Sequence, residues 1–128
     1  MFSESLLQVK QHLVLLGYTI VASEGNSFVA QHPQHKVFVM EDVDFVYLAS
    51  TYMPRDYSSD TASHLMALAN YGNQKSTVTR FFVGEDGNFV AWVLYAKPYD
   101  TSRFGRVLDH MKHDILKLAT SQLISYLV

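Results

Sequence analysis

Two histidines near the C-terminal end of the sequence, His110 and His113, have a spacing that could support metal chemistry. They stand three positions apart, beside Asp109 and Asp114. Residues at this spacing share one face of a helix, so two imidazoles could bind one metal ion. The spacing differs from the His-Glu-x-x-His pattern, and no third ligand lies nearby in the sequence. The apolar residues beside the pair favour a solvated helix flank. The shared helix face of His110 and His113 still leaves one alternative function, a small metal-binding protein or enzyme that uses this pair.

Other polar clusters have simpler interpretations. A proline lies between His32 and His35, which is typical of a turn. Glu41, Asp42 and Asp44 are close enough in sequence to raise one another's pKa or to bind a hard cation. Such a group is more often a solvated turn, or a set of charges that keeps an edge strand from pairing with another chain. We therefore expect no metal, no other cofactor and no catalytic residue.

A third cluster is basic. Lys97, Arg103 and Arg106 gather near the start of the last predicted helix, and with Tyr95 and Tyr99 they could hold an anion or a single nucleic-acid strand. Ion pairs with neighbouring aspartates are the simpler interpretation. The formal net charge of −2 and the pI of about 6.3 provide no basic field for nucleic acid. The sequence also has no Gly-x-Ser-x-Gly motif and no Gly-rich phosphate loop.

Composition limits the class of protein. The 128 residues predict a single domain, residues 1–128. Hydrophobic residues make up 48% and charged residues only 17%, so the polar surface is thin. Either a partner or a second copy covers part of the apolar area, or the chain is a compact monomer with Ser, Thr, Asn and Gln on its outside. The sequence lacks cysteine, a basic leader and an apolar run of the ~20 residues that span a bilayer. We expect a cytoplasmic protein without a membrane partner.

Residues 76–96 form the clearest structural signal. Two runs of β-branched and aromatic residues flank the segment 84–88, where Asp86-Gly87 supplies a tight turn. Glu85 and Asp86 are too few oxygen ligands for a calcium loop. Both runs carry bulky apolar residues at odd as well as even positions, which is typical of strands covered on both faces. The pattern predicts a hairpin at the centre of the sheet.

The rest of the sequence predicts an α+β fold. We expect a twisted antiparallel sheet of about five strands with N-terminal, middle and C-terminal helices packed on it. Ser3 is the predicted N-cap of the first helix, which Gly17 ends. The predicted elements are a helix over 3–16, strands over 18–22, 27–31, 36–40 and 45–49, a helix from 59 or 60 to about 71 that ends at Gly72-Asn73, the hairpin, and a helix from 100–102 to 126. The segments 36–40 and 45–49 are either two strands or one bent strand.

Residues 70–118 resemble the YbjN family, which has the fold of type III secretion chaperones. The resemblance is carried by Thr79-Arg80-Phe81-Phe82-Val83, the turn 84–88, Phe89-Val90-Ala91-Trp92, and a helix that opens near Asp100 and carries Phe104. It implies an α+β fold, often dimeric, that binds other proteins and performs no catalysis. Residues 37–53 are longer and more aromatic than the family pattern, so the number of strands there stays open.

Aromatic residues are the strongest indication of function. They exceed what three helices easily cover, and they provide large contact areas at low entropic cost, which suits protein interfaces. Alternation along a strand turns about half of them away from the covering helices. The sequence predicts a chaperone-like or regulatory module, a homodimer, that docks a peptide or protein segment on an apolar sheet face. The predicted partner-binding residues are Tyr47, Tyr52, Phe82, Phe89, Trp92 and Tyr95.

Overall fold

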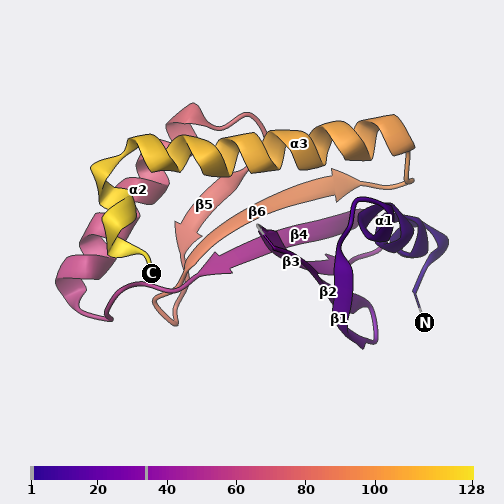
Figure 1. Cartoon of the computed structure of the whole chain (residues 1–128), viewed down its shortest axis with the longest axis horizontal. Helices are drawn as coiled ribbons and strands as arrows, with labels where there is room; N and C mark the ends of the chain where they lie inside the picture. Colours follow the sequence, from indigo (N-terminus) through magenta and orange to yellow (C-terminus); the bar gives the residue numbers. More distant parts are fainter. Residues whose placement is uncertain (1, 34) are drawn as a thin grey trace. The chain divides into compact units, whose positions relative to one another are not determined.

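The structure is a computed structural model that describes residues 2–33 and 35–128. Its elements follow the predicted order of helix, strands, helix, hairpin and helix (Figure 1). None of the helices in this described part of the chain is long and apolar enough to span a membrane. In chain order the elements are α1 (Glu4–Leu15), β1 (Thr19–Glu24), β2 (Ser27–His32), β3 (His35–Glu41), β4 (Phe45–Tyr52), α2 (Ser59–Lys75), β5 (Arg80–Val83), β6 (Phe89–Ala96), α3 (Thr101–Lys117) and two 3₁₀ helices, η1 (Leu118–Thr120) and η2 (Gln122–Tyr126).

The strands form one antiparallel sheet in the order β1-β2-β3-β4-β6-β5, which confirms the α+β class. Six strands are present where about five were predicted, because the chain reverses after β3. The Asp42 amide donates to the Phe45 carbonyl oxygen at 2.8 Å, so β3 and β4 are two paired strands. The predicted hairpin exists as β5 and β6, but its central position was wrong. Of the two hairpin strands, β5 lies at the edge of the sheet and β6 has a neighbour on each side.

The described residues group into two compact units, each treated separately below. The first unit comprises Met1–Ser50 and Leu94–Val107, and the second comprises Thr51–Val93 and Leu108–Val128. β4, β6 and α3 each contribute residues to both units. The single domain stays a prediction.

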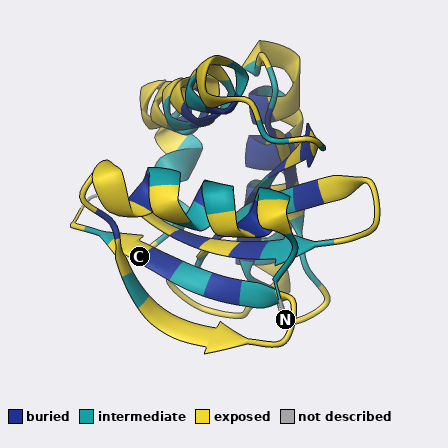
Figure 2. Ribbon diagram, turned by 90° about the vertical axis from the view of Figure 1, so that its right-hand side faces the viewer, coloured by how far each residue is buried: buried dark blue, intermediate teal, exposed yellow. Residues whose placement is uncertain are grey.

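In the first unit, α1 covers the strands with one apolar stripe. The Ser3 hydroxyl accepts a hydrogen bond from the Leu6 amide at 3.1 Å, and Gly17 follows the helix with φ +96°, as the sequence predicts. Leu6, Val9 and Leu13 recur at helical spacing and are fully buried. Figure 2 shows α1 lying across the strands of this unit, with buried and exposed positions alternating along them.

In the second unit, α2 is longer than predicted. Ser58 is its N-cap, not Ser59 or Asp60, because the Ser58 hydroxyl accepts from the Thr61 amide at 3.1 Å. Gly72 does not end the helix, which continues to Lys75. The backbone of Gly72 lies against other side chains instead. A Cβ added there would lie 2.6 Å from Cδ2 of Phe81 and 2.9 Å from Cδ2 of Leu118.

The chain after Lys117 also differs from the prediction of one helix to residue 126. Ser121 adopts an extended conformation, and the chain then turns back as η2. The Arg55 amide donates to the Tyr126 carbonyl oxygen at 2.8 Å, and the Val128 amide donates to the Met53 carbonyl oxygen at 3.0 Å. The Tyr126 ring lies between the Arg55 guanidinium, 4.2 Å from the ring centre, and the His64 ring, at 4.3 Å between centres. These contacts attach the C-terminal segment to the second unit.

We predict opposite effects for alanine at two helical glycines. Gly72→Ala should lower the free energy of unfolding by about 1–3 kcal/mol, because the methyl group has no space between Phe81 and Leu118. Gly105→Ala is the matched control. Its methyl group would meet the His12 ring at 3.8 Å, an ordinary contact, so the helix preference for alanine should stabilise the protein by about 0.5–1 kcal/mol. Thermal unfolding measures both changes. A Gly72→Ala variant as stable as the wild type would contradict the close packing.

Candidate functional site

The outward face of the first unit's sheet carries five uncharged, mostly apolar side chains from three neighbouring strands. We call them the outer strip: Val29 of β2, Phe38 and Met40 of β3, and Tyr47 and Ala49 of β4. Val29 is the strand partner of Phe38, and Phe38 is also the partner of Ala49. Met40 is the partner of Tyr47. The strip is therefore continuous across β2, β3 and β4, and Phe38 is 42% exposed.

The second unit has a smaller outward pair of the same kind. Phe82 on β5 faces Val90 on β6, and Arg80 faces Trp92 in the same register. Phe82 is 43% exposed, and Trp92 is half-buried. The side chains on the opposite parity of these strands, including Phe81 and Phe89, are buried against α2 and Leu118.

Strand alternation divides the six predicted partner-binding residues. Phe89 and Tyr95 are 0% and 1% exposed, so both belong to the core in this structure. The Tyr95 hydroxyl accepts from the Asp100 amide at 2.8 Å, and the Arg103 guanidinium lies 4.2 Å from the Tyr95 ring centre. Phe82 is exposed, and the other three are half-buried: Tyr47, Tyr52 and Trp92. As binding residues, all six stay predictions.

The sequence analysis did not single out Phe38 and Met40, which lie in the middle of the outer strip. The signal was present in β3, where Val37 and Val39 are buried and Phe38 between them is exposed. A strand with apolar residues on both parities must turn one set outward. The same argument was applied to the hairpin but not to β3.

The acidic cluster on β3 contains one residue with a structural role. Glu41 was expected in a solvated turn, but its carboxylate lies 2.7 Å from the Lys97 ammonium, and both side chains are mostly buried. Ser3 donates to the same carboxylate through its hydroxyl and through its amide, the latter at 3.0 Å. Burial alone would raise the pKa of Glu41, but these hydrogen bonds and the Lys97 charge hold it below its ordinary value. Asp42 and Asp44 are exposed, as predicted.

The predicted turn at Pro33 is present, and His35 follows it at the start of β3, where its side chain is buried. Its Nδ1 lies 2.7 Å from the Tyr18 hydroxyl, and its Nε2 lies 3.0 Å from the Ser50 hydroxyl. Ser50 donates its only hydroxyl proton to the Lys36 carbonyl oxygen, so it accepts from Nε2–H of His35. On the other side of the ring, Nδ1 faces the Tyr18 hydroxyl, whose pKa burial raises to about 12.

The His110 and His113 pair lies on the exposed side of α3. Both side chains are exposed, and His113 Nδ1 lies 2.9 Å from the Asp109 carbonyl oxygen. Among the residues that the structure describes, no group of three or more histidine or acidic side chains could hold a metal ion.

Asp114, beside that pair, has a role that the sequence did not reveal. Its side chain is fully buried, where a solvated flank was predicted. Its carboxylate accepts from the amides of Thr77, Val78 and Thr79 at 2.7, 2.9 and 3.0 Å. Burial would raise the pKa of Asp114, but the three backbone amides hold it below its ordinary value. Asp114 therefore fixes the segment between α2 and β5 to α3.

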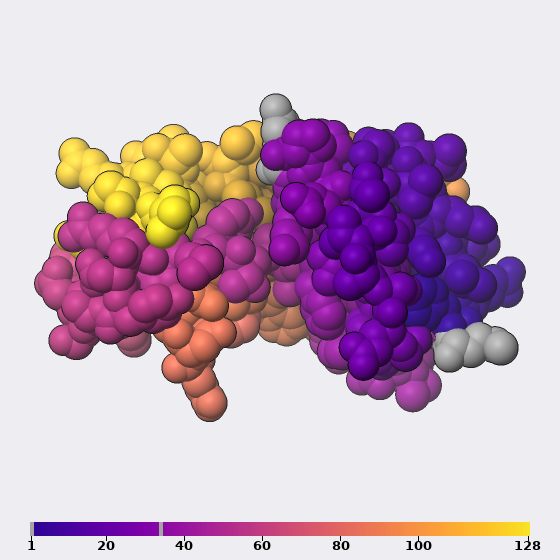
Figure 3. All heavy atoms as spheres, turned by 60° about the horizontal axis from the view of Figure 1, so that its bottom comes forward, coloured from indigo at the N-terminus to yellow at the C-terminus, as the bar shows by residue number. Residues whose placement is uncertain are grey.

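Two members of the basic cluster, Lys97 and Arg103, make local contacts, while Arg106 is exposed. Lys97 pairs with Glu41, and the Arg103 guanidinium donates to the Pro98 carbonyl oxygen beside its stacking on Tyr95. Asp100 accepts from the Arg103 amide at 2.8 Å and so caps α3, as predicted. The acidic turn between β5 and β6 projects from the second unit in Figure 3, and its Glu85 and Asp86 side chains are exposed.

These features define an α+β protein with a YbjN-like fold. It is similar to the crystal structure of YbjN from E. coli, with a TM-score of 0.73 and 12% sequence identity over 96% of this chain and 95% of that one. It is also similar to an uncharacterized protein from Methanothermobacter thermautotrophicus, with a TM-score of 0.59 and 12% identity over 90% of this chain and 94% of that one. No family model and no curated protein matches the sequence. The chaperone likeness stays a prediction.

We predict that Asp114→Asn lowers the free energy of unfolding by about 2 kcal/mol near pH 7, because an amide cannot accept three charge-assisted hydrogen bonds. The pKa of Asp114 is lowered in the folded state, so its contribution is present above the unfolded carboxyl range and is lost as pH falls through the folded value. Denaturant unfolding at several pH values should show a flatter acid limb in the variant. Asp109→Asn, at an exposed position of α3, is the control. If both variants lower the free energy of unfolding equally, Asp114 does not fix the segment between α2 and β5.

Proposed function

We propose that this chain is a non-catalytic module that binds an extended segment of another protein on the outer strip. The observation that supports the proposal is the continuity of the strip across three strands, with Phe38 exposed at its centre. Exposed apolar side chains that are contiguous on a folded surface are typical of protein interaction sites. We place the module in the cytoplasm, as composition predicts, without a nucleic-acid or membrane partner.

The chemistry of the strip favours an apolar, extended occupant. The strip contains no charged side chain, and it combines aromatic rings with the flexible thioether of Met40, which adapts to different partners. β1 is an edge strand of the same sheet, so its outer backbone groups could pair with an added strand. A segment with apolar side chains at every second position matches the pleat of the sheet and can place them all on one face.

The likeness to YbjN supports the proposal at the level of fold. YbjN is described as a candidate transcription regulator, and that description concerns YbjN. A regulatory role requires binding to another molecule, and the proposed use of the outer strip would provide it.

The test is selection of peptides from a random display library on the purified chain, followed by measurement of Kd for the selected peptides. We expect selected peptides to carry apolar residues at alternate positions. Phe38→Glu should weaken their binding at least tenfold, because it places a charge in the strip. Met66→Glu, at a position 58% exposed on α2, is the control and should bind as the wild type does. Peptides that bind both variants equally would exclude the outer strip as their site.

We also propose a homodimer in which Trp92 takes part, through folding or through the contact between copies. Trp92→Ala removes a large aromatic contact area from β6. We expect a lower solution mass, a lower melting temperature, or both. Sedimentation velocity and thermal unfolding provide the two values. If both values equal those of the wild type, Trp92 has neither role.

A further inference from the structure

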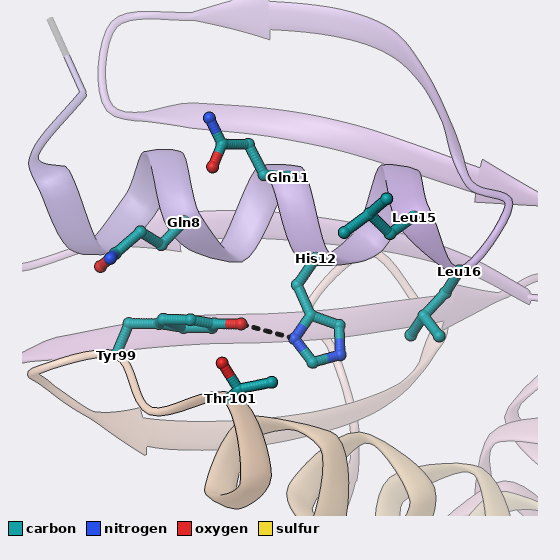
Figure 4. A pocket seen from close by; sticks show the side chains of 7 residues that line it. All are labelled: Gln8, Gln11, His12, Leu15, Leu16, Tyr99 and Thr101. Atoms are coloured by element: carbon teal, nitrogen blue, oxygen red, sulfur yellow. Dashed lines mark hydrogen bonds between the residues drawn. The ribbon is translucent and has the colours of Figure 1, made fainter.

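A hollow of about 320 Å³ lies on the first unit between α1 and the start of α3 (Figure 4). Gln8, Gln11 and His12 of α1 line one side of it, and Tyr99 and Thr101 line the other. Its volume is at the lower end of the range for small-molecule sites, about 300–1,000 Å³. The hollow is separate from the outer strip, so nothing in the following argument depends on the proposed function.

Two rings form a fixed wall of the hollow. His12 Nδ1 lies 2.7 Å from the Tyr99 hydroxyl oxygen, and Figure 4 shows the two groups facing each other beside Thr101. Behind them the His12 ring meets Phe104 edge to face, at 5.0 Å between centres. Gly105 also lies beside the imidazole, and a Cβ there would make an ordinary contact with it at 3.8 Å. The polar groups of the wall are therefore held in place before any ligand arrives.

The lining carries no full charge. Its polar groups are two carboxamides, two hydroxyls and one imidazole. Burial lowers the pKa of His12, which disfavours the charged form of its ring. Among the described residues that line the hollow there is no carboxylate to balance a cation, and the Asp100 carboxylate next to Thr101 offsets the attraction of the α3 N-terminus for an anion. An ion bound here would lose water without gaining a counter-charge.

We propose that this hollow binds a small uncharged ligand that carries a primary carboxamide on an apolar ring. The Gln8 and Gln11 side chains each offer a donor beside an acceptor, and a primary carboxamide can match either with two hydrogen bonds. The Tyr99 and Thr101 hydroxyls are further polar groups of the lining. Leu15 and Leu16 complete the lining, and Figure 4 places them on the other side of the imidazole from Tyr99, where an apolar ring can pack.

The first test compares three probes of one shape: benzamide, benzoate and benzamidine. Each is titrated into the isotope-labelled full chain, and amide and side-chain resonances are followed by NMR. We expect benzamide to produce saturable shifts confined to Gln8, Gln11, Thr101 and their neighbours. The anion and the cation should bind at least tenfold more weakly. Equal or tighter binding of benzoate, or no saturable benzamide shift up to its solubility limit, would overturn the proposal.

The second test removes one hydroxyl. Tyr99→Phe keeps the ring but loses the polar partner, and it should raise the Kd of benzamide about fivefold, the effect of one hydrogen bond. Tyr57→Phe is the matched control. Its hydroxyl donates to Asn88 at 3.0 Å in the second unit, so benzamide binding should not change. If Tyr99→Phe lowers the melting temperature, Gln11→Ala at an exposed position of α1 is the second variant, with the same expected loss. Unchanged binding in both hollow variants would exclude this site.

Discussion

The two-residue period of the strands is the constraint on which the rest of this structure depends. β3 and β6 carry apolar residues on both parities, so covering one face leaves apolar side chains on the other. In the first unit α1 buries the face that contains Val37 and Val39, and the outer strip remains on the opposite side. The same alternation in the second unit buries Phe81 and leaves Phe82 outside. The core and the apolar side chains left outside it thus arise from one pattern.

Buried polar groups fix the connections between these apolar layers. Within the second unit, Asp114 accepts hydrogen bonds from three backbone amides of the segment that leads into β5. Within the first, Glu41 holds Ser3 at the start of α1 and Lys97 after β6, and His35 joins Tyr18 to Ser50. Each of these groups has partners for its charge or its ring nitrogens, as burial requires. They bring together residues that are distant in the chain.

Local signals explain which parts of the fold could be predicted from the sequence. Ser3, Gly17 and Asp100 act within a few residues of themselves, and each has its predicted role at a helix end. The predicted helix end at Gly72 was wrong. A glycine is needed there because Phe81 approaches closely, and this tertiary contact overrides the usual role of glycine as a helix terminator. The burial of Asp114 depends on backbone amides 35–37 residues away, so it could not be predicted from residue spacing along the last helix. For the outward face of the sheet, alternation predicts the exposed side of Phe82 and includes Tyr47 of β4, but it was not extended to Phe38 and Met40 of β3.

Hydroxyl-radical footprinting of the free chain, at a dilution where its mass is that of one copy, tests the central claim most directly. The claim is that one face of the sheet is covered and the other is open to solvent. We predict that Phe38 and Phe82 are oxidised several times faster than Phe81 and Phe89, because the first two are exposed and the last two are buried. Equal protection of all four rings would mean that the outward face is already covered, and the account would be wrong.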